Sequence, residues 1–486
     1  MSAARFGLTG ATGEWELVIG LEVHCELSTA TKLFCGCPNR FGEEPNTNVC
    51  PVCLGLPGSL PVLNRSAVEL AMAIGTALGC RIAPSVFHRK NYFYPDMPKD
   101  YQVTQYDEPI NLDGALVLAD GSRVGIVRAH MEEDTGKTTH VGGDGRIHGA
   151  DYSLVDYNRA GVPLVEIVSA PDITSPEQAR AYVSELRRVL VATGASDGRM
   201  EEGSLRVDAN VSVRRAGTSP LGTRCEIKNL NSLRSLVRAI EYEARRQIEV
   251  LEDGGRVDQE TRHWNEGEGR TSSMRSKEEA FDYRYFAEPD LVRLAPEPSW
   301  IARVVAGIGL LPADRRRRLA EALGAEADAA ASEQIATVLD LGLDDLVIAA
   351  VAQGAPVRLA LARAANEAAQ DASAAQALAV GSFVEVLALE ASGSLSATQA
   401  KTVLAELLAS GGQPAEIVAR LGLEGLSAEQ LDASVDAVVA AHPTEWDRYL
   451  AGDDKVVQFL LGQVMRETKG RANGKLVAAA FARRRS

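Results

Sequence analysis

The feature that most constrains the fold is a change in the character of the sequence near residue 296. From about Glu14 to Pro296, short β-branched runs alternate with many Gly and Pro residues. From about Ser299 the chain is instead rich in Ala, Leu, Glu and Arg at helical spacing. The first pattern is typical of strands joined by turns and the second of helices. Because the two patterns occupy separate parts of the chain, the sequence predicts an α+β fold.

The same change suggests the domain organisation. We expect an N-terminal domain over residues 1–294, with an antiparallel sheet and flanking helices, and then an all-α middle domain over residues 295–396. A small helical tail domain would cover residues 397–486, after a break at the ASGSLS stretch. A length of 486 residues, at about 150 residues per domain, agrees with about three domains.

Composition narrows the class of protein. Apolar residues make up 45% and charged residues 24%, which is ordinary for a soluble globular protein. We find no uninterrupted apolar run of about 18 residues and no apolar segment of a secretory signal in Met1–Trp15, so we expect a cytoplasmic protein with no membrane association. The net charge of −15 excludes a surface that binds nucleic acid everywhere, although local basic patches remain possible.

Three helices of the N-terminal domain combine a periodic apolar stripe with end signals. They are expected over Asn64–Leu78, Ser175–Thr193 and Leu233–Leu251. The second should begin with Ser175 as its N-cap, with Gln178 completing a capping box.

Period-two alternation predicts which side chains share a face of each expected strand. In the strand over Ser204–Arg214 the alternation leaves one clean apolar side and one polar side, as expected for an antiparallel sheet with one polar, concave face. The polar residues placed on strand faces are Glu22, His24 and Glu26 in Leu17–Leu27; Glu166 in Pro163–Val168; Arg206, Asp208, Asn210 and Ser212 in Ser204–Arg214; and Glu226 and Lys228 in Arg224–Lys228.

Four of the seven cysteines form a local motif. Cys35-x-Cys37 is followed, after twelve residues, by Cys50-x-x-Cys53. Paired short spacings of this kind predict a tetrahedral Zn²⁺ site, which would be structural because four thiolates leave no open position for water. The alternative is four unrelated buried thiols.

Carboxylates from separate segments suggest a second metal site. Glu22 and His24 share a strand face, the segment around Glu133 has three consecutive carboxylates, and Glu166 lies between apolar neighbours. Such groups repel one another, or are costly to bury, unless a cation neutralises them. They predict a site for Mg²⁺ or Mn²⁺ of the kind that binds nucleotide phosphates. The alternative for each residue is an ordinary salt bridge.

A loop that interleaves basic and aromatic residues suits phosphate contact with base or ribose stacking. It contains Lys90, Tyr92 and Tyr94. The tyrosines could equally pack against the sheet. Since the sequence has neither a Walker A motif nor a dinucleotide glycine fingerprint, any ATP site would be of another kind.

Positive charge is concentrated near the C-terminus. Lys469, Arg471 and Lys475, followed by Arg483–Arg485, are the best candidates for nucleic-acid contact. They could alternatively cap helix ends or keep the tail soluble. The run Arg315–Arg318 is better explained as a solvated helix face.

Several motifs together resemble the B subunits of the aspartyl/glutamyl-tRNA amidotransferases, the GatB/GatE family. The resemblance extends from about residue 15 to the end and is most specific in the first 290 residues. His88 departs from the family pattern, in which an Asp is expected. The motifs are Val18-Ile-Gly-Leu-Glu-Val-His24, Pro45-Asn-Thr-Asn48, Arg89-Lys-Asn-Tyr-Phe-Tyr-Pro-Asp96, His130-Met-Glu-Glu-Asp134, Leu154-Val-Asp-Tyr-Asn-Arg-Ala-Gly-Val-Pro-Leu164, Met200-Glu-Glu-Gly-Ser-Leu-Arg206, Glu226-Ile-Lys-Asn-Leu-Asn231 and Asp282-Tyr-Arg-Tyr-Phe286.

The resemblance implies a heterotrimer in which an A subunit hydrolyses glutamine and a small C subunit clamps the assembly. The B subunit would bind mischarged Glu-tRNA(Gln) or Asp-tRNA(Asn), and its N-terminal cradle domain would activate the side-chain carboxylate with ATP. Ammonia from the A subunit would then displace phosphate. The helical middle and the tail would bind the tRNA.

The resemblance also implies roles for particular residues. Glu22, His24, Glu133 and Glu166 would bind Mg²⁺ at the catalytic centre, and the four cysteines would form a zinc knuckle over residues 35–53. We assign Lys90, Arg206 and Lys228 to the developing phosphate charge from their charge and location alone. Tyr92, Tyr94 and Asp208 complete the expected ATP and substrate contacts.

Two other functions are compatible with parts of the sequence. A non-catalytic tRNA-binding scaffold would keep the zinc knuckle but lose the carboxylate–histidine set, which is complete here. A standalone ligase would need its own ammonia source, and neither a Ser-Ser-Lys amidase constellation nor a Cys-His glutaminase pairing outside the cysteine cluster stands out in the sequence. Whether Asp-tRNA, Glu-tRNA or both serve as substrate would depend on which synthetases the cell has.

Overall fold

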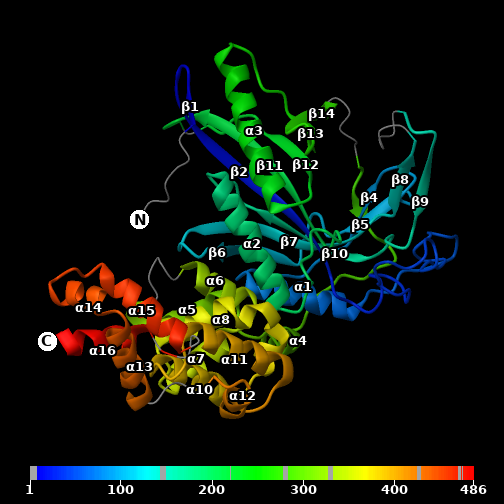
Figure 1. Ribbon diagram of the computed structural model, residues 1–486. Coiled ribbons are helices and arrows are strands. Elements are labelled where there is room, and N and C mark those ends of the chain that lie inside the picture. Colours follow the sequence, from blue (N-terminus) through cyan, green and yellow to red (C-terminus); the bar gives the residue numbers. More distant parts are fainter. Residues whose placement is uncertain are drawn as a thin grey trace. The chain divides into compact units, whose positions relative to one another are not determined.

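The computed structural model describes residues 8–142, 149–218, 220–276, 283–326, 332–423, 428–468, 472 and 474–485. The chain divides into two compact units, Met1–Ala313 and Asp314–Ser486 (Figure 1). All described strands belong to the first unit. They are β1 (Leu8–Gly10), β2 (Gly13–Glu26), β3 (Arg81–Ile82), β4 (His88–Asn91), β5 (Tyr101–Thr104), β6 (Asn111–Val117), β7 (Arg123–Glu133), β8 (Lys137–Val141), β9 (Tyr152–Asp156), β10 (Pro163–Ser169), β11 (Leu205–Arg215), β12 (Cys225–Leu230), β13 (Glu260–Asn265), β14 (Arg270–Ser276) and β15 (Phe286–Ala287).

One large sheet forms the frame of the first unit. Its strands pair in the order β14-β13-β12-β11-β2-β10-β7-β5-β4-β15, and β1, β3 and β6 pair beside this path. Strands β8 and β9 form a separate ribbon. Among the described residues, β12 and β13 form a parallel pair and the other pairs of the sheet are antiparallel. The expected antiparallel sheet is therefore correct except at this pair.

Strand β2 shows why the two faces of the sheet differ. Leu21, Val23 and Cys25 are completely buried, whereas Glu22 and His24 between them are half-buried. This is the alternation expected from the sequence. The apolar side contributes to one continuous core, whereas the side chains of the polar side remain outside this core and can contact a ligand.

Three described helices of the first unit pack against its sheet, and a fourth, α4 (Pro298–Ala306), packs against α1 (Arg65–Ala77) (Figure 1). The Ser175 side chain caps one of them, as expected, and the Asn64 side chain caps another. The capping box is not formed, because the Gln178 side chain accepts a hydrogen bond from the Thr174 N–H (2.9 Å) instead of that of Ser175. The other two helices are α2 (Pro176–Ala192) and α3 (Leu233–Glu252).

Beyond residue 312 the described chain is helical, and the α+β prediction is confirmed. None of the described helices is both long and apolar enough to cross a membrane. The helices are α5 (Pro312–Leu323), α6 (Ser332–Asp340), α7 (Asp344–Ala352), α8 (Val357–Asn366), α9 (Ala372–Ala377), α10 (Val380–Ala391), α11 (Ala397–Ser410), α12 (Pro414–Arg420), α13 (Ala428–Ala441), α14 (Pro443–Leu450), α15 (Val456–Glu467) and α16 (Gly474–Arg485), with 3₁₀ turns at Gly324–Glu326 and Ala368–Asp371.

Two apolar clusters stabilise the second unit. One extends from Leu319 to Ile417 and the other from Leu431 to Phe481. Helix α11, which follows the expected boundary at 396/397, packs against α10 within the first cluster. The division at 294/295 and 396/397 stays a prediction.

Candidate catalytic face and cysteine cluster

Adjacent strands of the large sheet present polar side chains on one face. Strands β7, β10, β2, β11 and β12 are neighbours in the sheet. Their register places Glu166 opposite both His130 and His24, and His24 opposite Arg206. In the next row, Glu22 lies opposite Asp208. Segments that are far apart in the sequence therefore meet on this polar face.

Three of the predicted metal ligands lie close together at the centre of this polar face. One potential ligand atom from each of Glu22, His24 and Glu166 lies within 4.8 Å of those of the other two. Asp208 and Glu226 form a second group of the same kind with Glu22. Carboxylate oxygens with one imidazole are donors that suit a hard divalent cation.

The fourth predicted ligand, Glu133, is not part of this cluster. Its carboxylate contacts the Lys99 ammonium and accepts a hydrogen bond from the Val103 N–H (2.9 Å). Its neighbour Glu132 lies by the cluster instead, with Oε1 at 3.0 Å from Nδ1 of His24. The alternation of β7 explains the difference, since adjacent residues of a strand point to opposite faces. The period-two argument used for the other strands would have selected Glu132.

Sequence reasoning also missed His130. Its Nε2 lies 3.3 Å from Oε2 of Glu166, and the ring is almost completely buried. His130 and Glu132 are two residues apart on β7 and therefore share a face. Their ligand atoms form a further potential metal-binding group with Glu166.

The charges of this cluster depend strongly on one another. Burial disfavours the charged form of His24, but the hydrogen bond with Glu132 and the nearby carboxylates outweigh it and raise the pKa of His24 to about 9. Burial, together with Glu166 and Glu226, raises the pKa of Glu22. For Glu166, burial is outweighed by His130 and His24, which lower its pKa. Closely spaced acidic and imidazole groups of this kind are typical of functional sites.

The predicted phosphate-binding lysine, Lys228, is already paired. Its Nζ lies 2.7 Å from both Asp208 and Glu226. Burial disfavours its charge, but these two carboxylates prevail and raise its pKa. Lys228 therefore neutralises and positions Asp208 in this structure.

The second predicted cation, Arg206, also has an acidic partner. Arg206 Nη2 lies 3.0 Å from Oδ1 of Asp134, and Arg159 Nη2 lies 2.5 Å from Oδ2 of the same carboxylate. Asp134 is buried, whereas both guanidinium groups are partly exposed. The sequence analysis did not select Asp134 or Arg159.

The basic and aromatic loop places its residues near one another. The Lys90 ammonium lies 4.8 Å from the ring centre of Tyr283 and 6.0 Å from that of Tyr92. Burial raises the pKa of Tyr92, with Asp96 and Glu132 adding to the effect. Tyr94 is 40% exposed. This arrangement supplies one cation and several ring faces.

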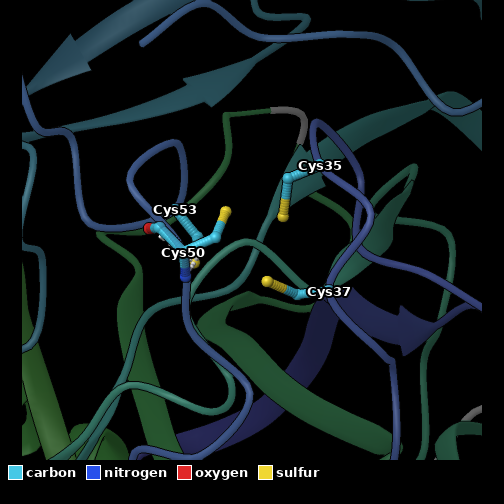
Figure 2. A group of neighbouring side chains, drawn as sticks. All are labelled: Cys35, Cys37, Cys50 and Cys53. Carbon is cyan, nitrogen blue, oxygen red and sulfur yellow. Dashed lines mark hydrogen bonds between the residues drawn. The ribbon is translucent and has the colours of Figure 1, made fainter.

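The four cysteines form a compact cluster. Their sulfur atoms lie within 4.8 Å of one another, and Figure 2 shows Cys35 and Cys37 facing Cys50 and Cys53 across one space. The Cys53 thiol has a pKa lowered to about 5, mainly by its hydrogen bond with Cys35 and despite burial. The four thiols fit a tetrahedral zinc shell, in which Zn–S distances of about 2.3 Å bring the sulfurs close together.

A buried lysine near the cluster was also missed. Lys32 is completely buried, and its ammonium donates to the carbonyl oxygens of Asn48 (2.7 Å) and Tyr157 (3.3 Å). The hydrogen bond with Cys35 is the main cause of the low pKa of Cys53, and a backbone hydrogen bond from Cys50 and the charge of Lys32 lower this pKa further against the effect of burial.

The predicted tRNA-binding cations cannot be placed. Lys469 and Arg471 lie outside the described residues, and for Lys475 only the backbone is described, at the start of α16. The arginines at the end of this helix form ion pairs, since Arg484 contacts Asp432 and Asp436 and Arg485 contacts Asp454.

Comparison with models of known protein families defines the class of protein to which this chain belongs. Residues 17–302 match the family model of the GatB/GatE catalytic domain, and residues 356–484 match that of the GatB domain. The first match contains the polar face and the cysteine cluster.

Individual relatives are similar over almost their whole length. The aspartyl/glutamyl-tRNA(Asn/Gln) amidotransferase B subunit of Nocardia farcinica is 51% identical, over 95% of this chain and 94% of its own. The B subunit of the same name from Moorella thermoacetica is 50% identical, over 96% of this chain and 98% of its own. The chain belongs to the family of aspartyl/glutamyl-tRNA(Asn/Gln) amidotransferase B subunits, which confirms the resemblance found in the sequence.

Proposed function

We propose that this chain catalyses the ATP-dependent activation and amidation of mischarged Glu-tRNA(Gln), Asp-tRNA(Asn) or both. The observation that carries the proposal is the grouping of Glu22, His24 and Glu166 within 4.8 Å on the polar face. The named function of the relatives as tRNA amidotransferase subunits supports it. The chain would act in a heterotrimer with a glutaminase A subunit and a C subunit, in the cytoplasm.

The chemistry explains why such a site is needed. A carboxylate is a poor electrophile because oxide leaves badly. In the first step a side-chain carboxylate oxygen attacks the terminal phosphorus of ATP, and ADP leaves. In the second step ammonia attacks the acyl carbon, the bond to the phosphorylated oxygen breaks, and phosphate leaves with the amide formed.

The residues of the polar face fit a magnesium-dependent version of this reaction. Bound Mg²⁺ would neutralise the charge of the ATP phosphates. Glu22, Glu166 and Nε2 of His24 would bind it. Glu132, and not the Glu133 predicted from the sequence, would support this set from its place beside His24. Because a carboxylate only accepts hydrogen bonds, Glu132 at Nδ1 would fix the orientation and tautomer of the His24 ring.

The surrounding residues would bind the substrates. Lys90, Tyr92 and Tyr94 would contact ATP, since they provide a cation beside ring faces. Arg206 would contact the substrate from its place opposite His24, held by Asp134. Asp208 would make a further contact with the substrates, and its ion pair with Lys228 would hold the Asp208 carboxylate in position.

The cysteine cluster would bind one structural Zn²⁺ in a knuckle over residues 35–53, within a cradle domain over residues 1–294. The compact arrangement of the four sulfur atoms supports this. The helical segments over 295–396 and 397–486 would bind the tRNA.

The direct test is amide formation by the chain assembled with its partner subunits. Labelled Glu-tRNA and Asp-tRNA would be supplied with ATP, Mg²⁺ and ammonium. We expect labelled Gln-tRNA or Asn-tRNA to form, and omission of ATP to prevent it. A complex that binds these tRNAs but forms neither product would support the scaffold function instead.

The isolated chain should not release ammonia from glutamine. The reason is the lack of an amidase nucleophile set in its sequence. Glutamine and the purified chain would be incubated with and without the A subunit, and ammonia would be measured. Glutaminase activity of the chain alone would contradict the proposed division of labour.

The tail cations should contribute to tRNA binding. Lys469, Arg471 and Lys475 concentrate positive charge in a chain of net charge −15, so replacing them by Ala should weaken tRNA binding. Each lost phosphate contact should also reduce the slope of log affinity against log salt by about 0.9, the value for duplex DNA.

The control for this experiment is Lys401→Ala in the same unit, because Lys401 is paired with Glu367 at 2.9 Å. Affinity would be measured at several salt concentrations for the assembled complex. Equal affinity and slope in the triple variant and in the unmodified complex would leave the tail cations without a role in binding.

A further inference from the structure

Arg128 of β7 stands out among the cations of the polar face. Its Nε is buried and has no hydrogen-bond partner in the described part of the chain. Arg206 and Lys228, on other strands of this face, each contact a carboxylate. Within the same described ranges Arg128 forms no ion pair.

The register places Arg128 beside the catalytic cluster. It lies opposite Val168, two residues from Glu166, which itself lies opposite His130. Arg128 and Glu166 are therefore diagonal neighbours on one face of two paired strands. In the order of the strands, Arg128 on β7 lies on one side of β2 and β10, which carry Glu22, His24 and Glu166. Arg206 on β11 and Lys228 on β12 lie on the other side.

One side of the Arg128 guanidinium faces an aromatic ring. The Arg128 Cζ lies 5.9 Å from the ring centre of Tyr106, and Tyr106 stacks on Tyr285 with ring centres 4.1 Å apart and an angle of 9°. A cation over a ring is stabilised without using its N–H donors. Because the Nε of Arg128 is itself buried, the terminal N–H groups of the guanidinium are the donors that remain for an acceptor, which the described part of the chain does not provide.

An unpaired, partly buried guanidinium is unfavourable for folding, so its presence calls for a ligand. Arginine is always charged and offers planar N–H donors that match the oxygens of a phosphate. We propose that Arg128 binds the terminal phosphoryl group of ATP and stabilises its charge during transfer to the substrate carboxylate. This inference rests on the proposed function and adds a catalytic residue to it.

The test compares Arg128→Met, Arg128→Lys and the control Arg123→Met in the assembled complex. Arg123 lies at the exposed start of the same strand. The measured quantities are the rate of ADP formation that depends on charged tRNA, the KM values for ATP and tRNA, and the thermal unfolding temperature. Glutamine hydrolysis by the A subunit serves as an internal reference for assembly.

We expect Arg128→Met to lower kcat for ADP formation by about 10²- to 10³-fold, with Arg128→Lys recovering at most about tenfold of this. Arg123→Met should match the unmodified complex. The unfolding temperature of Arg128→Met should change little, because Arg128 acts on the Glu166 carboxylate through its charge but forms no close ion pair with it in the described part of the chain. A purely structural role would lower that temperature instead.

Three results would overturn the assignment. The first is a kcat of Arg128→Met within about threefold of the unmodified complex. The second is a raised KM for the charged tRNA with an unchanged kcat, which would mean that Arg128 binds the aminoacyl group. The third is a lowered unfolding temperature for both Arg128 variants. In each case the unmodified complex would still form ADP with charged tRNA, whereas its failure to do so would overturn the proposed function as well.

Discussion

Replacement of Glu166 by Gln should lower the rate of ATP-dependent phosphorylation of charged tRNA by about 10³-fold or more. Glu166 joins Glu22 and His24 in the central cluster and also contacts His130. The substitution keeps the shape of the side chain but removes the charge that a bound cation needs. His24→Ala should have an effect of similar size. ADP release would be measured with Mg²⁺ and charged tRNA, while glutamine hydrolysis should remain measurable.

The two neighbouring carboxylates of β7 provide the matched comparison. Glu132→Gln should reduce phosphorylation, because Glu132 contacts His24. Glu133→Gln should instead reduce the free energy of unfolding, by about 3–5 kcal/mol, because it leaves the Lys99 ammonium buried without its partner. A stable but inactive Glu133→Gln variant would favour the ligand set predicted from the sequence. Near-normal amidation by Glu166→Gln or His24→Ala would refute the proposed catalytic centre.

Loss of zinc should have the second large effect. The purified protein should contain about one Zn²⁺ per chain and Cys50→Ser none, because three thiolates cannot close the tetrahedral shell. Structural zinc contributes directly to folding free energy, so this variant should unfold at least several kcal/mol more easily. Metal analysis and denaturant unfolding would measure the two quantities.

Cys80→Ser is the matched control for this experiment, because Cys80 is a free cysteine outside the cluster. It should retain the metal. A chelator should destabilise the unmodified protein and the Cys80 variant but leave Cys50→Ser unchanged. A metal-free unmodified protein of unchanged stability would rule out the zinc site.

Much of the first unit could be predicted because local rules decide it. The alternation of β2 follows from its own residues, and so do the caps at Asn64 and Ser175. The four cysteines lie within 19 residues of sequence (35–53), so their grouping is also a largely local property. Sequence pattern and structure therefore agree for features that depend on residues close together in the sequence.

The remaining features depend on which distant groups meet. The choice between Glu132 and Glu133 depends on the phase of β7, for which the short motif offers only the alternation of His130 and Glu132 with Met131. The pairing of Lys228 with Asp208, and of Arg206 with Asp134, depends on strands and loops that are remote in the sequence. Among the described residues, the lack of a hydrogen-bond partner for the Arg128 Nε is likewise visible only once the neighbouring strands are in place.

The position of Glu133 also has a consequence for evolution and engineering. By contacting Lys99 and the Val103 N–H, its side chain anchors the end of β7. A shift of β7 by one residue would exchange the faces of all its side chains and remove His130 and Glu132 from the site together. A substitution in this strand therefore changes one side chain, whereas an insertion or deletion between Arg128 and Glu133 would remove several residues of the proposed catalytic centre in a single step.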